Sequence, residues 1–490
     1  MLDRRGFLVL SAVGAAAACS RSGRPAATPT TSASPNALDV GLTPGPTQID
    51  LGGVTVSTWA YNGRVPGKEI RLRKGETLRA VVTNNLPADT SVHWHGLAIP
   101  NPMDGVPVLT QAATAPGQRF NYEFAVPDSG TYWFHSHEGT QTDRGLFGPL
   151  IIEDPNERAK YDDELVLVLD DWIDGTGTNP DQVLEKLKMN GMASMSPMAP
   201  DAGVTPTTPL GDDGGDVTYP YFVINGRVRT DPQTVDYRAG QRIRLRIINA
   251  GGDTAFRVGV PNTKMTVTHT DGFPVVPRET DSVILGMGER VDATITLNSS
   301  VPVIAAAYGK DGFAQLNMRV NGAPSGVKID QYVAALNITA PLDTAGLPAT
   351  PEVNLSQRNP DQTVELRLAG PSNGYHWTIN GKLYDPPNDG IEVTPAQRVR
   401  IRFVNESKMF HPMHFHGHTA QVMLPTGEPG GPGGLGGGRP APAARKDTVL
   451  VAPLATVDID FDTNNPGKWI SHCHNTHHLE SGMATFLYYS

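Results

Sequence analysis

Hydrophobic and polar residues alternate in short runs along most of this chain, as in the stretch from Gln241 to Ile248. Alternation with a period of two places successive side chains on opposite faces of a strand, so each run predicts a half-buried β-strand. Glycine and proline, at 52 and 42 residues, are frequent, and helical periodicity is scarce. A helix-like pattern occurs at Pro180–Lys188. The chain is therefore predicted to be an all-β protein.

One sequence unit occurs three times. Each copy holds a short alternating run that leads to an asparagine nine residues after its first member, and these residues are Asn84, Asn249 and Asn405. An Asn-Gly pair, which favours a two-residue hairpin turn because both positions tolerate positive φ, precedes each copy, at 62–63, 225–226 and 380–381. Copies about 160 residues apart are too widely spaced for a solenoid and suit complete domains. The sequence thus predicts three tandem β-sandwich domains.

The predicted divisions of the chain are an export signal and tether, then the three domains, at residues 1–37, 38–155, 156–330 and 331–490, the last beginning with a linker. Arg4-Arg5 and the short apolar run from Phe7 to Ala18 resemble a twin-arginine export signal. Cys19 follows Ala16-Ala17-Ala18 and resembles a lipoprotein cleavage site, the alternative being an ordinary signal with an incidental cysteine. We therefore expect a protein outside the cytoplasm, either attached to the cell envelope by lipid on Cys19 or secreted. Residues 20–37 are rich in Ser, Thr, Pro and Ala, as in a flexible tether.

The net charge limits the kinds of molecule that the protein can bind, and the cysteine content limits its disulfides. The formal net charge is −10, which argues against nucleic acid and is compatible with metal cations or neutral aromatics. The two cysteines are Cys19, in the leader, and Cys473, so no structural disulfide is expected. We expect a monomer that is stabilised by its core.

Four His-X-His pairs use eight of the 14 histidines. Residues i and i+2 of a strand share a face, so each pair presents two imidazoles side by side. A single pair can arise by chance, but four predict a polynuclear metal centre. The pairs are His93 and His95, His135 and His137, His414 and His416, and His472 and His474.

The repeat shows how these pairs are related. The first and third copies each carry a pair nine and eleven residues after the repeated asparagine, where the second copy has Val258 and Val260. The other two pairs each begin five residues after a glycine, Gly130 or Gly467. We therefore expect one cluster at the interface of domains 1 and 3, with domain 2 acting mainly as a spacer.

The fourth pair has Cys473 between its histidines, directed at the opposite face. A thiolate with two imidazoles and a weak axial thioether is the ligand set of blue copper, and His411, His478 and Met483 lie near Cys473 or its partner motif. Ser136, at the matching position of domain 1, is a poor ligand for a soft metal, so a single blue site is expected. Zinc is the main alternative, but structural zinc sites favour closed Cys-rich sets with CxxC spacing, which this sequence lacks.

The motifs resemble those of the three-domain multicopper oxidases, the family of laccases, ascorbate oxidase and bacterial copper-efflux oxidases. The likeness is closest to the lipoprotein-type oxidases of actinobacteria and covers about residues 45–490. It rests on His-Trp-His-Gly at 93–96, His-Ser-His at 135–137 and the longer motifs at 411–418 and 472–483. It implies three cupredoxin-like Greek-key domains and four copper ions, namely one type 1, one type 2 and two type 3.

The resemblance also implies which residues bind each ion. By motif position, type 1 copper takes His411, Cys473, His478 and axial Met483; type 2 takes His93 and His414; one type 3 ion takes His95, His135 and His474; and the other takes His137, His416 and His472.

The implied reaction joins four one-electron oxidations of a reducing substrate to the reduction of O2 to two waters. Electrons pass from the type 1 site through Cys473 and its neighbouring histidines to the trinuclear cluster. Asp104 and Glu480 match carboxylates of the family that supply protons. The plainer alternatives are turn formation for Asp104 and surface solvation for Glu480.

The electron donor is left open between phenols or aromatic amines and the ions Cu(I), Fe(II) or Mn(II). Methionines recur every third residue after the helix-like segment, at Met189, Met192, Met195 and Met198. Thioethers bind Cu(I), so these residues are candidates for Cu(I) recruitment, with a linker or a flexible lid as the alternative. A dedicated cuprous oxidase for copper tolerance and a non-catalytic copper-binding protein are the rival functions.

Overall fold

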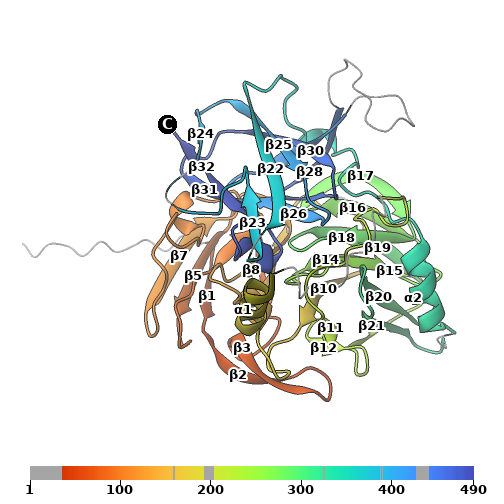
Figure 1. The fold of residues 1–490 in the computed structure, drawn as a ribbon. Helices are drawn as coiled ribbons and strands as arrows, with labels where there is room; N and C mark the ends of the chain where they lie inside the picture. The colour runs from red at the N-terminus through yellow and green to blue at the C-terminus, as the bar shows by residue number, and fades with distance from the viewer. Residues whose placement is uncertain are drawn as a thin grey trace, which may run out of the picture. The chain divides into compact units, whose positions relative to one another are not determined.

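The computed structural model describes residues 36–157, 160–191, 204–323, 326–372, 374–386, 388, 390–425 and 441–490. Strands dominate this part of the chain and form three successive groups of sheets (Figure 1). The prediction of an all-β protein is confirmed. None of the helices among the described residues is long and apolar enough to cross a membrane.

The first domain contains a sheet of order β1-β5-β7, a sheet of order β4-β9-β8-β6 and the hairpin β2-β3. Its strands are β1 (Ala37–Leu42), β2 (Pro44–Asp50), β3 (Thr55–Tyr61), β4 (Ile70–Arg73), β5 (Thr77–Thr83), β6 (His93–His95), β7 (Arg119–Ala125), β8 (Gly130–His135) and β9 (Phe147–Glu153). Two short 3-10 turns, η1 (Asn101–Met103) and η2 (Thr142–Arg144), follow the histidine strands β6 and β8 along the chain.

The second domain pairs a seven-stranded sheet, β12-β11-β10-β14-β19-β16-β17, with a five-stranded sheet, β13-β21-β20-β15-β18. Its strands are β10 (Asp163–Trp172), β11 (Tyr221–Ile224), β12 (Arg227–Val228), β13 (Thr234–Tyr237), β14 (Gln241–Asn249), β15 (Phe256–Gly259), β16 (Met265–Thr270), β17 (Phe273–Thr280), β18 (Ser282–Leu285), β19 (Arg290–Leu297), β20 (Val301–Ala307) and β21 (Phe313–Val320). Helix α1 (Pro180–Asn190) follows β10, and α2 (Ile329–Ile338) follows β21.

The third domain pairs a six-stranded sheet, β23-β22-β25-β30-β27-β28, with a five-stranded sheet, β24-β32-β31-β26-β29. After η4 (Pro351–Val353), its strands are β22 (Gln362–Ser372), β23 (His376–Ile379), β24 (Ile391–Val393), β25 (Arg398–Asn405), β26 (His411–Phe415), β27 (Ala420–Leu424), β28 (Ala441–Lys446), β29 (Thr448–Val451), β30 (Thr456–Asp462), β31 (Lys468–Cys473) and β32 (Ala484–Tyr489). Helix α3 (Thr476–Leu479) connects the last two strands. The exact domain boundaries stay a prediction.

The sequence repeat has a structural counterpart in a buried asparagine at the end of β5, β14 and β25. Asn84 Nδ2 donates to the carbonyls of Ala88 and Thr114, and its Oδ1 accepts from Leu86 N. Asn249 and Asn405 make the same kind of bonds, each to the loop that follows it and to the end of a more distant strand, β18 or β29. The predicted Asn-Gly turns are also confirmed, because the asparagines have φ of 53–54° and the glycines 72–74°. The side-chain bonds explain why each copy needs an asparagine at this place.

Helix α1 begins at Pro180, as the sequence pattern predicted. It ends at Asn190, two residues beyond the predicted end at Lys188. The Asn179 side chain caps it by accepting a hydrogen bond from Gln182 N at 3.0 Å, and Pro180 occupies the first turn, where no amide donor is needed. At its other end, Lys188 Nζ donates to the carbonyl of Glu480 at 2.8 Å. This bond ties the helix to the third domain.

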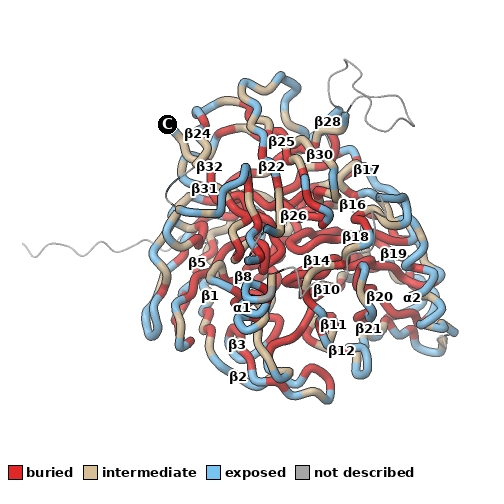
Figure 2. Tube along the Cα trace, in the orientation of Figure 1, coloured by how far each residue is buried: buried red, intermediate tan, exposed pale blue. Residues whose placement is uncertain are grey.

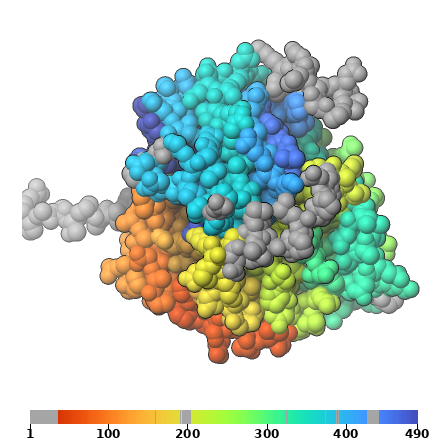
Figure 3. All heavy atoms as spheres, viewed as in Figure 1, coloured from red at the N-terminus to blue at the C-terminus, as the bar shows by residue number. Residues whose placement is uncertain are grey.

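The domains pack closely against one another. Buried stretches run along the inner strands, whereas the peripheral loops are exposed (Figure 2). One apolar core cluster contains residues of both the second and the third domains. Figure 3 shows the third domain, in blue, lying against the first and second domains on the viewed face. Asn101 Nδ2 donates to the carbonyl of Lys468 at 2.7 Å, which joins the first domain to the third.

Candidate metal centre

The four histidine pairs are carried by two equivalent pairs of strands. In the first domain β6 lies antiparallel to β8, and His93 is opposite His135. In the third domain β26 lies antiparallel to β31, and His414 is opposite His472. The same register in both domains presents matched sets of imidazoles, as the repeat predicted.

These eight imidazoles gather into one buried cluster. The rings of His93 and His416 stack at 3.8 Å between centroids, and those of His95 and His414 do the same. Ligand nitrogens that lie within 4.8 Å of one another form the groups His93, His414 and His416; His93, His95 and His135; and His137, His416 and His472. His474 joins the cluster with its ring 5.0 Å from that of His95.

The buried ring nitrogens fit a metal centre because they have no other partner. Nε2 of His93, His135, His137 and His414, Nδ1 of His95 and both nitrogens of His474 lack a hydrogen bond. On the opposite side of several rings Nδ1 is held by a backbone carbonyl, as His93 is by Asp104 and His414 by Asp447, each at 2.8 Å. Bonds of this kind fix the tautomer and orientation of metal-binding imidazoles.

The protonation state also suits metal binding. Burial lowers the pKa of these rings well below the usual value, and neighbouring imidazoles lower it further, for His95, His135, His137, His414, His416 and His474. Burial lowers the pKa of His472 to about 4. The rings are therefore neutral at pH 7 and can offer lone pairs to a cation.

Two carboxylates lie beside the cluster. Asp104 is fully buried, and its Oδ2 lies 3.0 Å from His416 Nδ1. Glu480 lines both a cleft of about 490 Å³ that reaches His137 and a small inner space beside His472 and His474. Burial raises the pKa of Glu480 to about 7, although nearby Lys188 opposes the shift. A carboxyl group with that pKa exchanges protons readily near neutral pH.

A second site surrounds Cys473, which is fully buried. Its Sγ lies 3.6 Å from His411 Nδ1 and 3.5 Å from His478 Nδ1, and the two nitrogens are 3.2 Å apart. Trp377 stacks on the His478 ring at 4.0 Å. Met483 is buried in the same core, and its carbonyl accepts from Cys473 N. The structure thus brings together the predicted thiolate and imidazoles, with Met483 next to them.

Sequence reasoning missed Asp216, whose Oδ2 lies 2.9 Å from His478 Nε2. Tyr375 OH donates to the same carboxylate oxygen. Burial alone would lower the pKa of His478, but the bond to Asp216 and the neighbouring Cys473 raise it to about 10. Asp216 therefore stabilises positive charge at His478. Asp216 ends the acidic run Asp-Asp-Gly-Gly-Asp at 212–216. This run was the only available clue, and it matches neither a strand pattern nor a metal-binding motif.

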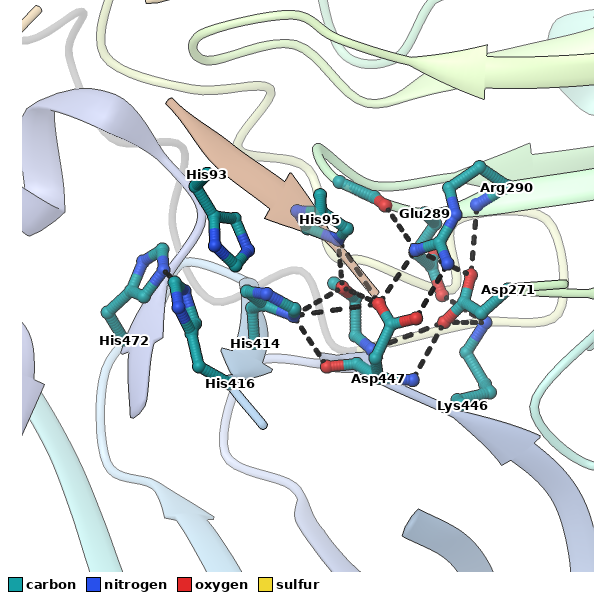
Figure 4. Close-up of polar contacts among 12 residues, drawn as sticks. His93, His95, Asp271, Glu289, Arg290, His414, His416, Lys446, Asp447 and His472 are labelled. Atoms are coloured by element: carbon teal, nitrogen blue, oxygen red, sulfur yellow. Dashed lines mark hydrogen bonds and ion pairs between the residues drawn. The ribbon is translucent and has the colours of Figure 1, made fainter. Parts of the chain in front are cut away.

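Asp447 and Thr448 were also missed. Asp447 Oδ1 lies 3.1 Å from His95 Nε2, and Thr448 Oγ1 lies 3.2 Å both from that atom and from His414 Nδ1. Figure 4 shows Asp447 between the imidazoles and a group of charged residues.

The methionine segment is described only at its start. Met189 is 75% exposed on α1. Gly191, just after the helix, lies against Gly374. Met192, Met195 and Met198 lie outside the described residues, as do Cys19 and the glycine-proline stretch at 426–438.

Paired-sheet domains with one thiolate–imidazole site and one polyimidazole cluster define a class of protein, the copper-dependent oxidases with several metal sites. Comparison with known proteins agrees. Models of the multicopper oxidase family match residues 45–157, 163–317 and 357–490. The chain belongs to the multicopper oxidase family.

Similar proteins span most of the chain. It is 41% identical to multicopper oxidase MmcO of Mycobacterium tuberculosis, over 91% of this chain and 86% of that protein. Copper resistance protein A of Pseudomonas syringae pv. tomato is 26% identical, with coverage of 90% and 91%. A solved multicopper oxidase from Pseudomonas thermotolerans gives a TM-score of 0.68 at 26% identity, with coverage of 93% and 99%. Fet3p, a multicopper oxidase that functions in iron import, gives 0.76 at 23% identity, with coverage of 93% and 90%.

Family membership confirms the predictions of three cupredoxin-like domains, of an oxidoreductase and of a copper cofactor. The protein uses four copper ions and couples the oxidation of reducing substrates to the reduction of O2. Other similar proteins are named copper resistance protein A, laccase and iron transport multicopper oxidase fetC.

Proposed function

We propose that this oxidase takes its electrons mainly from metal ions, with Cu(I) as the principal donor, and so contributes to copper tolerance. The observation that carries this proposal is the burial of His478, whose side chain is 0% exposed. An organic donor that transfers electrons by contact with the imidazole edge needs that edge at the surface. Here Asp216 covers the outer nitrogen.

The residues around Asp216 suit a cation. Asp212 is exposed and Asp213 is half-buried in the same loop, so the approach to His478 is acidic. Asp216 itself is held in place by Tyr375 OH and by its backbone amide, which donates to Asp253 Oδ1 at 3.2 Å. Fixed negative charge raises the local concentration of cationic donors.

The proposed ligand sets follow the sequence motifs. The type 1 ion is held by His411, Cys473, His478 and Met483, the type 2 ion by His93 and His414, and the two type 3 ions by His95, His135 and His474 and by His137, His416 and His472. The partnerless nitrogens support these sets. Copper supplies one-electron redox chemistry and the reduction of O2 at these sites.

Asp104 and Glu480 are the proposed proton-handling residues, and Cys473 with its two neighbours links the two sites. Asp104 lies against His416 and His93, inside the cluster. Glu480 stands between the cleft and the cluster, where it can pass protons inward from solvent. From these positions both carboxyl groups can supply the protons that are needed to convert O2 into water.

The donor is tested by replacing Asp216 with Asn and measuring steady-state kinetics with Cu(I) and with a phenol on fully copper-loaded protein. We expect the KM for Cu(I) to rise about tenfold, a loss of about 1.4 kcal/mol, because one negative charge is removed from the approach. The phenol KM should stay the same or fall. Asp39→Asn, an exposed change of the same kind on β1 of the first domain, is the matched control and should leave both KM values unchanged. Equal effects of Asp216→Asn on both donors would contradict the proposal.

The same assay tests the methionine segment, which we propose gathers Cu(I) before oxidation. The exposure of Met189 supports this role. Replacing Met189, Met192, Met195 and Met198 with Leu keeps the bulk but removes the sulfur, so the KM for Cu(I) alone should rise. An equal change in KM for both donors would mean that the segment only covers the site and does not bind Cu(I).

We further propose that the chain acts as a monomer outside the cytoplasm, exported by the twin-arginine signal and attached to the membrane by lipid on Cys19. The residues before Cys19 support this proposal. A Cys19→Ser variant that stays in the membrane fraction would contradict lipid attachment.

A further inference from the structure

The second domain supplies no histidine to the cluster, yet one of its turns reaches the cluster directly. The turn joins β18 to β19 and contains Gly286 and Gly288, and Arg290 follows it as the first residue of β19. A Cβ on Gly288 would lie 2.8 Å from His474 Cδ2 and 3.0 Å from His95 Cε1. The backbone of the second domain therefore touches imidazoles from both other domains.

Arg290 is fully buried, and its guanidinium contacts all three domains. Nη1 and Nη2 donate to the two oxygens of Asp447 at 2.7 and 2.6 Å, and Nε donates to the carbonyl of Thr131 at 3.1 Å. Nη1 also donates to the carbonyl of Gly288 in its own turn at 3.0 Å. A planar guanidinium can make this fork to a carboxylate, and an ammonium group cannot.

Asp447 passes this restraint to the cluster (Figure 4). Its Oδ1 faces His95 from the first domain, and its carbonyl accepts from His414 Nδ1 in the third. Thr448 Oγ1 donates to Asp447 Oδ1 at 2.9 Å and lies within 3.2 Å of a nitrogen of each histidine.

A second group of charged residues restrains the ion pair of Arg290 and Asp447. Asp271 Oδ1 accepts from the backbone amide of Arg290 at 2.9 Å, and its Oδ2 accepts from the amides of Asp447 and Thr448. Lys446 Nζ lies 3.1 Å from Asp271 Oδ2 and 3.0 Å from Glu289 Oε1, with all three side chains buried. The network leaves Arg290 and Asp447 little freedom to move.

The first domain is shaped around the same pair. Gly96, the last residue of the His-Trp-His-Gly motif, has φ of +90°. A Cβ there would lie 2.5 Å from Arg290 Nη2 and 2.6 Å from Asp447 Oδ2. The motif therefore needs glycine because the ion pair occupies the space of a side chain.

We infer that Arg290 is a positioning residue for the trinuclear copper site, through which the second domain holds His95 and His414 in their binding orientation by way of Asp447. This role rests on the proposed assignment of those two histidines as copper ligands. It also changes the interpretation of the second domain, which is a structural component of the metal site as well as a spacer.

The test replaces Arg290 with Lys and follows copper retention. Wild-type and variant proteins are fully loaded, then dialysed against increasing concentrations of a copper chelator. Total copper and the blue absorption of the type 1 site are measured at each step. Loss of a residue that orients metal ligands typically weakens metal affinity by about 10–100-fold. We therefore expect Arg290→Lys to release trinuclear copper at a chelator concentration at least about tenfold lower, while the blue absorption is retained.

Arg257→Lys is the matched control, because Arg257 is also a buried arginine of the second domain and its guanidinium donates to the backbone carbonyls of Leu336 and Thr207. If Arg290→Lys does not fold, Gly96→Ala acts on the same ion pair from the first domain, with Gly63→Ala controlling for positive φ where a Cβ has room. Gly96→Ala should show the same selective loss of trinuclear copper.

Equal retention of copper by the test and control variants would overturn the inference while leaving the proposed ligands intact. A wild-type protein that binds no more than the type 1 ion would instead overturn the ligand assignment, and this inference with it.

Discussion

At the scale of single residues, the chemistry of both sites depends on which atoms are left without partners. In the cluster, inner nitrogens of six of the eight histidines lack hydrogen bonds, whereas several outer nitrogens are held by carbonyls or carboxylates. Asp104 combines two such contacts, because its carbonyl binds His93 and its carboxylate faces His416. Its role is therefore testable separately from that of the ligands.

Asp104→Asn keeps the size of the side chain and removes its charge and its capacity to carry a proton. Lost acid–base assistance typically slows a reaction by about 10²–10⁴-fold, so we expect O2 reduction to slow by at least about tenfold. Anaerobic reduction of the type 1 site by substrate should hardly change. If anaerobic bleaching of the blue absorption slows as much as turnover, Asp104 acts on electron entry instead.

The sequence predicted the histidines and Cys473 because each is part of a spaced motif. Asp216 and Asp447 could not be found in this way. Asp216 lies in a glycine-rich turn 262 residues from His478, and Asp447 is 352 residues from His95. Both belong to the site only through the packing of domains, which local spacing does not reveal.

At the scale of elements, the alternating strands predicted from sequence carry cross-strand ion pairs. On β25, Arg398, Arg400 and Arg402 lie opposite Asp462, Asp460 and Asp458 of β30. The equivalent strand of the second domain pairs Arg244 with Asp292 across the buried face. The alternation of arginine with apolar residues thus places a charged ladder on one face and the core on the other.

Two Arg–Asp pairs of this ladder differ mainly in how far they are buried. Arg400 donates to both oxygens of Asp460, at 2.7 and 2.9 Å, and the Asp460 side chain is 1% exposed. Arg402 makes a similar pair with Asp458, but its side chain is 43% exposed.

Arg400→Met should lower the free energy of unfolding by about 3 kcal/mol, because a buried carboxylate loses its partner. Arg402→Met should cost about 1 kcal/mol or less, since the exposed pair is screened by water. Scanning calorimetry of the two variants gives the comparison. Similar melting temperatures for both would mean that burial does not control the strength of these pairs.

At the scale of the whole molecule, the repeat correctly predicted three β-sandwich units and two matched sets of histidines. Comparing ligand positions among the copies indicated that the second domain was a spacer, because Val258 and Val260 replace the histidines. Contacts outside the repeat, made by Gly288 in a turn and by Arg290 at the start of β19, cannot be detected by such a comparison. The spacing of repeats and motifs in a sequence thus predicts its domains more readily than the contacts between those domains.

The central claim is that one chain holds a thiolate copper site and a separate polyimidazole copper cluster, connected through Cys473. The most direct measurement is copper per chain together with visible absorption, in the wild-type protein and in Cys473→Ser. Ser136→Ala, at the equivalent place in the first domain, is the control and should keep the blue absorption.

We predict that the wild-type protein binds four copper ions and absorbs intensely near ~600 nm, the mark of a thiolate–copper site. Cys473→Ser should lose that absorption and one ion while retaining the other three. A Cys473→Ser protein that stays blue, or that loses the whole cluster together with the type 1 ion, would contradict the account.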